Sequence, residues 1–385
     1  MADLIPDQVH ARHIRRADMV ACEVAFIDCR MPGSERKLNY SLIGPGVTQS
    51  HDQVVNLSEP HGFSLGVAAM PPGTINNLHV HFTAEVFMVH KGHWTFRWGD
   101  GGRDGTIEGG PGDVVSVPTW IFRGFSNTGD TDGWIFTALG GDDTGGIIWH
   151  PSILANAAQY GMYLTQDNML VDTTAGQPAP APEQRMAPLS PEQVAALPRY
   201  TPADMARQVV KAQDRQWSAN ALLCSGLPGM ACELAPVLGH GMTEDRAQAA
   251  PVSGAHGFSV EWLRLAPGQR VGRHMLAEKQ VAIVFAGALD VLVGGVPVHV
   301  ADGECYSFPP GAWREIAADG AGNGAEVALV TAGDARKRIT WAPDIVQAAM
   351  AAGHGIDHNG YVAPLALMPP PTRAAVQGRM MQAAE

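Results

Sequence analysis

The sequence predicts an all-β protein with peripheral helices, in which two tandem β-barrels arose by internal duplication. A repeat at a constant spacing and a strand-like alternation of side chains carry this prediction. The 385 residues suit two average domains better than one. The composition agrees, because 44 glycines and 28 prolines accompany short apolar runs, as in strands joined by tight turns.

The repeat is visible at a single offset along much of each half. The segment LIGPGVTQ, which begins at Leu42, matches VLGHGMTE, which begins at Val237, 195 residues further on. The segment HGFS begins at His61 and again at His256, at the same spacing. A constant offset through several uncommon residues favours duplication over coincidence.

Within each repeat the pattern predicts strands that are followed by a closing helix. Trp94, Phe96 and Trp98 alternate with polar residues, which is the period of two expected of a strand. Each repeat ends in an alanine-rich segment, residues 153–160 and 345–352, that precedes a glycine as a helix end does.

The boundary between the copies is predicted from composition. Residues 173–193 are rich in proline and alanine, which indicates an extended linker. This places one domain at residues 1–172 and the other at 194–385. Ser190 followed by Pro191 predicts the start of a helix, with the serine as its cap.

The bulk properties exclude several classes of function. The net charge of −12 disfavours nucleic-acid binding, and no apolar run is long enough for a bilayer. The N-terminus lacks the apolar core of a secretory signal. Five cysteines, an odd number without a close pair, favour a reduced interior over a disulfide framework. We therefore expect a soluble, cytoplasmic protein with no membrane partner.

One motif carries metal-binding chemistry. Gly73, His79, His81, Glu85 and Gly92 follow the spacing G-x5-H-x-H-x3-E-x6-G. Residues two apart on a strand share a face, so both histidines point the same way and the glutamate keeps that parity. Two imidazoles and a carboxylate form a three-ligand face that suits non-haem Fe(II) and leaves positions open for substrate and oxygen. The ligands alone do not select the metal, since imidazole also accepts Mn, Ni, Cu or Zn.

This spacing resembles the first motif of the cupin superfamily, and Gly112-x5-Pro118 resembles its second motif. The resemblance covers residues 44–142 and 239–334, and it implies a jelly-roll barrel in each copy. Cupins usually supply a fourth ligand, a histidine, from the second motif, but this sequence has Arg123 there. Arginine stays protonated and cannot coordinate a metal.

Two interpretations of Arg123 stay open. In one, the three remaining ligands hold a metal and Arg123 binds a substrate carboxylate in bidentate fashion. In the other, the site is vestigial and Arg123 forms a buried ion pair with Glu85. Arg314 occupies the corresponding place in the second copy, so a structural role for the arginine is equally open.

The second copy has lost most of the motif. His274 corresponds to His79, but Leu276 and Gln280 stand where the first copy has its second histidine and its glutamate. We therefore expect one divalent metal in the N-terminal barrel, with Fe(II) favoured, and none in the C-terminal barrel.

Bicupins with one working metal site resemble the ring-cleaving dioxygenases for hydroxylated aromatic acids, such as gentisate and salicylate dioxygenases. That resemblance implies a metal-dependent dioxygenase that uses O2 on a small organic acid, an aromatic one in the first instance. Arg123 would hold the substrate carboxylate, and Trp120, where the family usually has glycine, would line the pocket. The alternatives are a metal-dependent isomerase, decarboxylase or lyase, and a non-catalytic bicupin that binds a small ligand. Cupins often associate through their outer sheets, so a homo-oligomer is expected.

Overall fold

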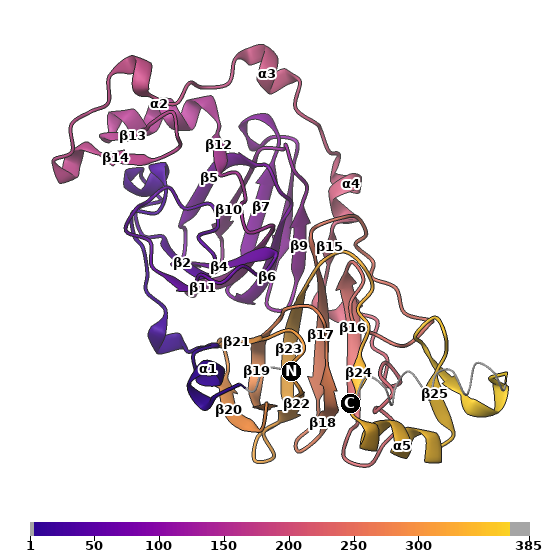
Figure 1. The fold of residues 1–385 in the computed structure, drawn as a ribbon. Helices are drawn as coiled ribbons and strands as arrows, with labels where there is room; N and C mark the ends of the chain where they lie inside the picture. Colours follow the sequence, from indigo (N-terminus) through magenta and orange to yellow (C-terminus); the bar gives the residue numbers. More distant parts are fainter. Residues whose placement is uncertain (1–3, 370–385) are drawn as a thin grey trace. The chain divides into compact units, whose positions relative to one another are not determined.

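The structure, a computed structural model, describes residues 4–369 and divides them into two compact units. The first unit is Asp18–Asp214, and the second comprises residues 215–369 together with residues 4–17. Both are built mainly of strands (Figure 1). None of the described helices is long and apolar enough to cross a membrane.

The first unit contains two curled sheets, and nearly all of their neighbouring strands are antiparallel. The seven-stranded sheet has the order β15 (Val209–Val210), β9 (Val114–Val117), β6 (Glu85–Lys91), β11 (Gly133–Gly140), β4 (Phe63–Met70), β2 (Leu38–Ile43) and β3 (Val55–Leu57). The five-stranded sheet has the order β12 (Ile147–Trp149), β5 (Ile75–His81), β10 (Arg123–Asn127), β7 (Trp94–Trp98) and β8 (Gly105–Gly109). Only β2 and β3 pair in parallel among these strands.

Strand β7 confirms the alternation expected from the sequence. Trp94, Phe96 and Trp98 are buried, whereas Thr95 and Arg97 between them are partly exposed. The three aromatic rings belong to one core cluster in the interior of the first unit. Burial of one face of this strand therefore supplies apolar packing on which the barrel closes.

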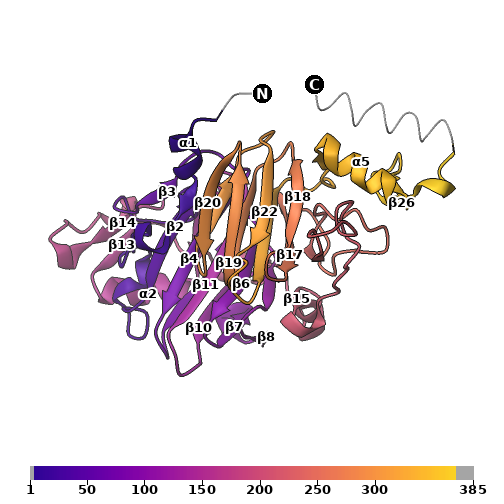
Figure 2. The same ribbon diagram turned by 90° about the horizontal axis from the view of Figure 1, so that it is seen from below.

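The second unit has one continuous ten-stranded sheet. Its main path is β16 (Cys232–Leu238), β17 (Phe258–Leu265), β23 (Ala325–Ala332), β19 (Gln280–Val293), β22 (Arg314–Ala318), β18 (Arg270–Met275) and β24 (Thr340–Trp341), and β20 (Val296–Ala301), β21 (Cys305–Phe308) and β1 (His13–Ile14) attach to it. Strands β20, β19, β22 and β18 lie side by side (Figure 2).

The long strand β19 plays the part of both β6 and β7. Its first half pairs with β21 and β23, and its second half pairs with β20 and β22. The register shifts between Val284 and Ala286, where the strand passes from one part of the sheet to the other. Gly287 lies at this bend with φ +75°, and its counterpart Gly92 separates β6 from β7 with φ +87°. Both positions need the left-handed backbone region, which glycine adopts without strain.

A short helix followed by a two-residue strand adds to the edge of a sheet in each unit. In the second unit β1 pairs with β21, and it follows the helix α1 (Pro6–His10). In the first unit β15 pairs with β9, and it follows the similar helix α4 (Pro202–Ala206). The segment that precedes each repeat therefore packs on the barrel that the other repeat forms.

The predicted helices are confirmed. Helix α2 (Pro151–Gln159) closes the first repeat and α5 (Pro343–Ala351) closes the second, each beginning two residues earlier than expected because a proline opens it. Helix α3 (Pro191–Ala195) begins as predicted, and the Ser190 hydroxyl accepts a hydrogen bond from the Gln193 backbone N–H at 3.2 Å.

Candidate metal centre

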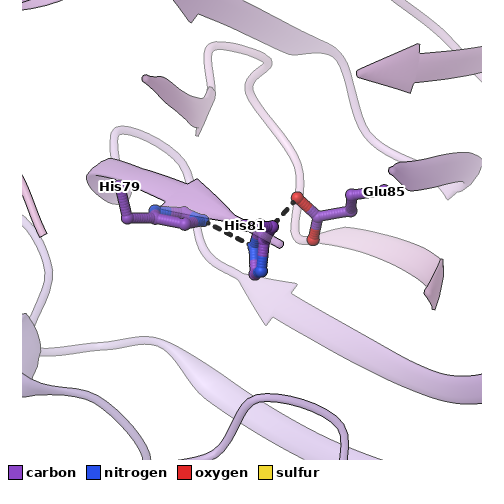
Figure 3. A group of neighbouring side chains, drawn as sticks. All are labelled: His79, His81 and Glu85. Carbon is purple, nitrogen blue, oxygen red and sulfur yellow. Dashed lines mark hydrogen bonds and ion pairs between the residues drawn. The ribbon is translucent and has the colours of Figure 1, made fainter. Parts of the chain in front are cut away.

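The structure brings the three predicted ligands together at one end of the first barrel. His79 and His81 lie at the end of β5, and Glu85 is the first residue of β6 (Figure 3). One ligand atom from each residue lies within 4.8 Å of the others. The two Nε2 atoms are 3.0 Å apart, and His81 Nε2 is 3.3 Å from Glu85 Oε2. All three side chains are buried.

A backbone carbonyl orients the first histidine. His79 Nδ1 is 2.7 Å from the carbonyl oxygen of Asn77, so Nδ1 carries the proton and donates it. Its Nε2 is then a bare nitrogen that faces His81. The indole ring of Trp149 packs beside the imidazole, with 5.2 Å between ring centroids. A hydrogen bond from the outer nitrogen of a histidine is the usual way in which proteins orient a metal ligand.

Burial sets the charge states of the ligands. It lowers the pKa of His79 to about 3, with the neighbouring His81 as the next cause. Burial, and then the Arg123 charge, hold the pKa of His81 well below its usual range. Burial raises the pKa of Glu85, which the Arg123 charge opposes. Both imidazoles are therefore neutral at physiological pH, which is the form that coordinates metals.

The donor set fits a divalent metal. Donors at about 2.1 Å from an ion, at right angles to one another, are about 3 Å apart, close to the His79–His81 and His81–Glu85 separations of 3.0 and 3.3 Å. Glu85 Oε2 is buried and has no hydrogen-bond partner in the described part of the chain. Arg123 compensates the charge of this carboxylate only from 3.9 Å, and a divalent cation bound to the oxygen would supply the direct partner that it lacks.

Arg123 lies directly beside this cluster. It begins β10, opposite His79 in the strand register, and is 2% exposed. Its Nη1 is 3.9 Å from Glu85 Oε2, and its Nη2 donates a hydrogen bond to the Pro118 carbonyl. Burial lowers the pKa of Arg123 to about 10, so the group stays charged at neutral pH. The arginine thus pairs with Glu85 without displacing the glutamate from the two histidines.

A pocket with a cavity volume of about 70 Å³ opens onto the three ligands. Part of its wall is apolar, from Phe26, Phe125 and Trp149. The rest is rich in neutral hydroxyl and amide groups, from Tyr40, Ser41, Thr48, Gln53, Ser64 and Thr137. Neither lysine nor arginine is among the described residues that line it. A ligand here would meet the three donors directly and the Arg123 charge through Glu85.

Trp120 does not line this pocket. Its side chain is 41% exposed, and its ring packs edge-on against Phe82 with 5.0 Å between centroids. Its backbone has φ +61°, a region that non-glycine residues rarely adopt. The counterpart Gly311 has φ +68°, so the turn geometry belongs to both barrels.

Sequence reasoning did not identify the groups that support the ligands. The Asn77 and Pro118 carbonyls act through the backbone, so no side-chain type points to them. Tyr40 and Thr48 come from a segment far from the motif in sequence, and only the folded barrel brings them to the pocket.

In the second barrel the equivalent positions keep only part of this arrangement. His274 Nδ1 is 2.8 Å from the Gly272 carbonyl, and Trp341 packs 5.5 Å from its ring. Leu276 is buried, and Gln280 donates from Nε2 to another side chain, the Thr331 hydroxyl, at 2.9 Å. His79, His81 and Glu85 are the one group of three candidate ligands found among residues 4–369.

Comparison with known proteins establishes the fold. A model of the cupin domain matches residues 66–137 and again residues 261–331. Both barrels are cupin domains. The predicted fold class, two tandem jelly-roll barrels of mainly β structure, is confirmed. No curated protein sequence matches the chain.

Solved structures of similar fold include oxalate decarboxylases and a globulin. The oxalate decarboxylase of Lactobacillus farciminis has a TM-score of 0.52 at 14% identity, over 84% of this chain and 86% of that one. The oxalate decarboxylase of Bacillus subtilis has a TM-score of 0.51 at 13% identity, over 85% and 77%. The 7S globulin of Momordica charantia has a TM-score of 0.51 at 10% identity, over 86% of each chain. At such low identity these similarities show the fold and not the activity. The finer resemblance to gentisate and salicylate dioxygenases stays a prediction.

Proposed function

We propose that the N-terminal barrel binds one divalent metal through His79, His81 and Glu85 and acts on a small organic acid there. The observation that carries the proposal is that three buried donors lie within 4.8 Å of one another in the wall of one pocket. When bound, the metal would supply Lewis-acid chemistry to oxygen atoms of the substrate.

The chain's own residues define the chemistry around the metal. The Asn77 carbonyl holds His79 in the tautomer that presents Nε2. The Arg123 charge lies 3.9 Å from Glu85 Oε2, where it restrains the carboxylate and adds positive potential. A positive site with low exposure to water favours an anionic substrate, such as a carboxylate. The proposed role of Arg123 toward a substrate carboxylate would be exerted by its charge through Glu85, since no arginine is among the described residues that line the pocket.

We favour decarboxylation as the reaction class. A metal that polarises a carbonyl or carboxylate oxygen can stabilise the charge left when carbon dioxide departs. The similarity to two oxalate decarboxylases supports this choice only through the fold. Dioxygenation with Fe(II) and O2 is the second candidate, because two histidines and one carboxylate form the ligand set of non-haem iron oxygenases.

The setting is part of the same proposal. The five cysteines are buried free thiols, as a reducing compartment favours, and we propose a cytoplasmic location. We also propose that the chain forms a homo-oligomer. The alternative is a non-catalytic bicupin that binds a small ligand. A negative result in the following test would favour it.

The test uses untagged protein, stripped with a chelator and reloaded anaerobically with Fe(II), Mn(II) or Zn(II) in separate samples. Each sample is assayed with small carboxylic acids and hydroxybenzoates for carbon dioxide release and for oxygen uptake. Carbon dioxide release without stoichiometric oxygen uptake would support decarboxylation. Oxygen uptake matched to substrate loss would support dioxygenation. A protein that takes up no metal from any sample would overturn the proposal.

A further inference from the structure

Arg314 in the second barrel is a buried cation without protein partners for its side-chain nitrogens. It begins β22 and is 1% exposed. Its Nε, Nη1 and Nη2 all lack a hydrogen-bond partner among residues 4–369. Burial lowers the pKa of Arg314 to about 9, so the guanidinium is still charged at neutral pH. The ring of Phe308, 4.9 Å from the guanidinium carbon, offers a cation–π contact but no hydrogen-bond acceptor.

The equivalent arginine of the first barrel has partners that Arg314 lacks within the described chain. Arg123, at the equivalent position, has the Glu85 carboxylate at 3.9 Å and the Pro118 carbonyl as partners. In the second barrel the glutamate is replaced by Gln280, whose amide nitrogen donates to Thr331 instead. The Glu278 charge favours the ionised form of Arg314, but no hydrogen bond joins the two side chains, and a buried charge whose hydrogen bonds are not made is costly. An anion beside Arg314 would offset that cost.

The groups near the arginine indicate which kind of anion fits. His274 lies opposite Arg314 in the β18–β22 register, and its imidazole is fully buried. Because its Nδ1 donates to the Gly272 carbonyl, its Nε2 is an acceptor, and this atom has no partner in the described residues. Gln280 Oε1 is a second acceptor in the same condition. A matching ligand therefore offers oxygen acceptors to Arg314 and one hydroxyl donor to His274.

We propose that the interior of the second barrel binds a small oxyanion that carries one hydroxyl group, of which hydrogencarbonate is the smallest. Two of its oxygens would accept the parallel N–H groups of Arg314, as carboxylates do. Its hydroxyl would donate to His274 Nε2. The site is independent of the metal centre and of the proposed reaction.

Glu278 defines the competing account. Its charge favours the ionised form of Arg314, and its Oε2 is also buried without a partner. Water molecules that bridge Glu278 to Arg314 would satisfy both groups without any anion. The experiment must therefore separate a bound oxyanion from bridging water.

The experiment is a calorimetric titration of the metal-free full chain at mildly alkaline pH and constant ionic strength. Sodium hydrogencarbonate, sodium formate and sodium chloride are the probes. Formate has the two acceptor oxygens but no hydroxyl. We expect saturable binding of about one hydrogencarbonate per chain, formate weaker by about tenfold for the lost hydrogen bond, and no chloride binding.

Variants locate the site. Arg314→Met should abolish hydrogencarbonate binding, while the matched change Arg123→Met in the first barrel should keep it. His274→Leu should bring hydrogencarbonate and formate to equal affinity. Absence of saturable hydrogencarbonate binding in the folded wild-type protein would overturn the proposal in favour of bridging water. Unchanged binding in Arg314→Met would overturn it as well. If Arg314→Met does not fold, the comparison of hydrogencarbonate with formate in wild type and His274→Leu decides.

Discussion

The two barrels share one scaffold but differ in what their interiors can hold. In both, a histidine is fixed by a backbone carbonyl and an arginine stands opposite it in the strand register. The first barrel adds His81 and Glu85, which complete a donor set. The second has Leu276 and Gln280 at these places. Replacement of these two side chains therefore distinguishes the second barrel from the candidate metal centre of the first. The order of the surrounding strands is the same in both.

The interior space differs as well. Gly66 lines the pocket of the first barrel, and an added Cβ would lie 3.0 Å from the Tyr40 carbonyl oxygen. The equivalent position in the second barrel is Glu261, which is fully buried and accepts a hydrogen bond from the Met242 backbone N–H at 2.8 Å. At this one position a side chain fills space that belongs to the pocket in the first barrel. The same barrel framework therefore accepts either a glycine that borders a pocket or a buried glutamate at this position.

The largest expected effect comes from making the first barrel resemble the second. The double change His81→Leu with Glu85→Gln should remove metal binding entirely, because one imidazole cannot hold a divalent ion against competing water. The fold should persist, since the second barrel carries the same residues. Elemental analysis with circular dichroism checks both points. Leu276→Ala, at the matched position of the second barrel, should lower stability by about 2–5 kcal/mol and leave the metal content unchanged.

A second change tests whether Arg123 serves the metal site or has a purely structural role. Arg123→Met should destabilise the metal-free protein by about 3 kcal/mol, because Glu85 would be left buried without a charge partner. Bound metal should restore most of that stability and should still be retained, while the KM for an anionic substrate should rise by about tenfold. Thermal unfolding with and without metal measures the first effect. A loss of stability that metal does not repair would instead assign Arg123 a purely structural role.

A third difference predicts that the second barrel has a pH dependence, at the position of Glu244, that the matched position of the first barrel lacks. Gln49 Oε1 accepts from the Trp149 indole N–H at 3.1 Å, and Glu244 accepts from the Trp341 indole N–H at 3.0 Å. Burial raises the pKa of Glu244 to about 7 from its usual value of 4.5. A raised pKa means that ionisation of Glu244 lowers the stability of the folded protein. The stability that the protonated carboxyl contributes is therefore fully present below about pH 4.5 and is lost as the pH rises to about 7.

Glu244→Gln should remove this loss, because an amide oxygen can accept the same bonds, as Gln49 does. We expect a gain on the order of 2 kcal/mol above pH 7 and little change in acid. Unfolding by denaturant across the pH range is the measurement. The reciprocal change Gln49→Glu should introduce the loss into the first barrel. An equal gain at every pH would show that ionisation of Glu244 is not the cause.

The smallest effect is expected at the turn that Trp120 and Gly311 share. Trp120→Gly should alter stability by less than about 1 kcal/mol, because relief of the left-handed backbone offsets the lost packing on Phe82. Since Trp120 does not line the pocket, substrate KM should not change. A clear rise in KM would return Trp120 to the pocket wall that the sequence predicts.

The sequence was informative where one residue type has a fixed consequence. Strand parity placed His79 and His81 on one face. Gly92 and Gly287, which lie at matching bends of the two barrels, helped to align the two repeats. The pairing of residues 4–17 with the second barrel was not predictable, because a two-residue strand carries no periodicity. Arg123 was recognised as a departure from the cupin pattern, but its distance from Glu85 depends on side-chain packing that spacing does not describe.

The most direct test of the central claim is a metal titration of the untagged, chelator-treated chain under anaerobic conditions. The account predicts saturation at about one divalent ion per chain in the wild type and none in His81→Leu with Glu85→Gln. Absence of binding in the wild type, or equal binding in the double variant, would contradict the assignment of His79, His81 and Glu85 as a metal centre.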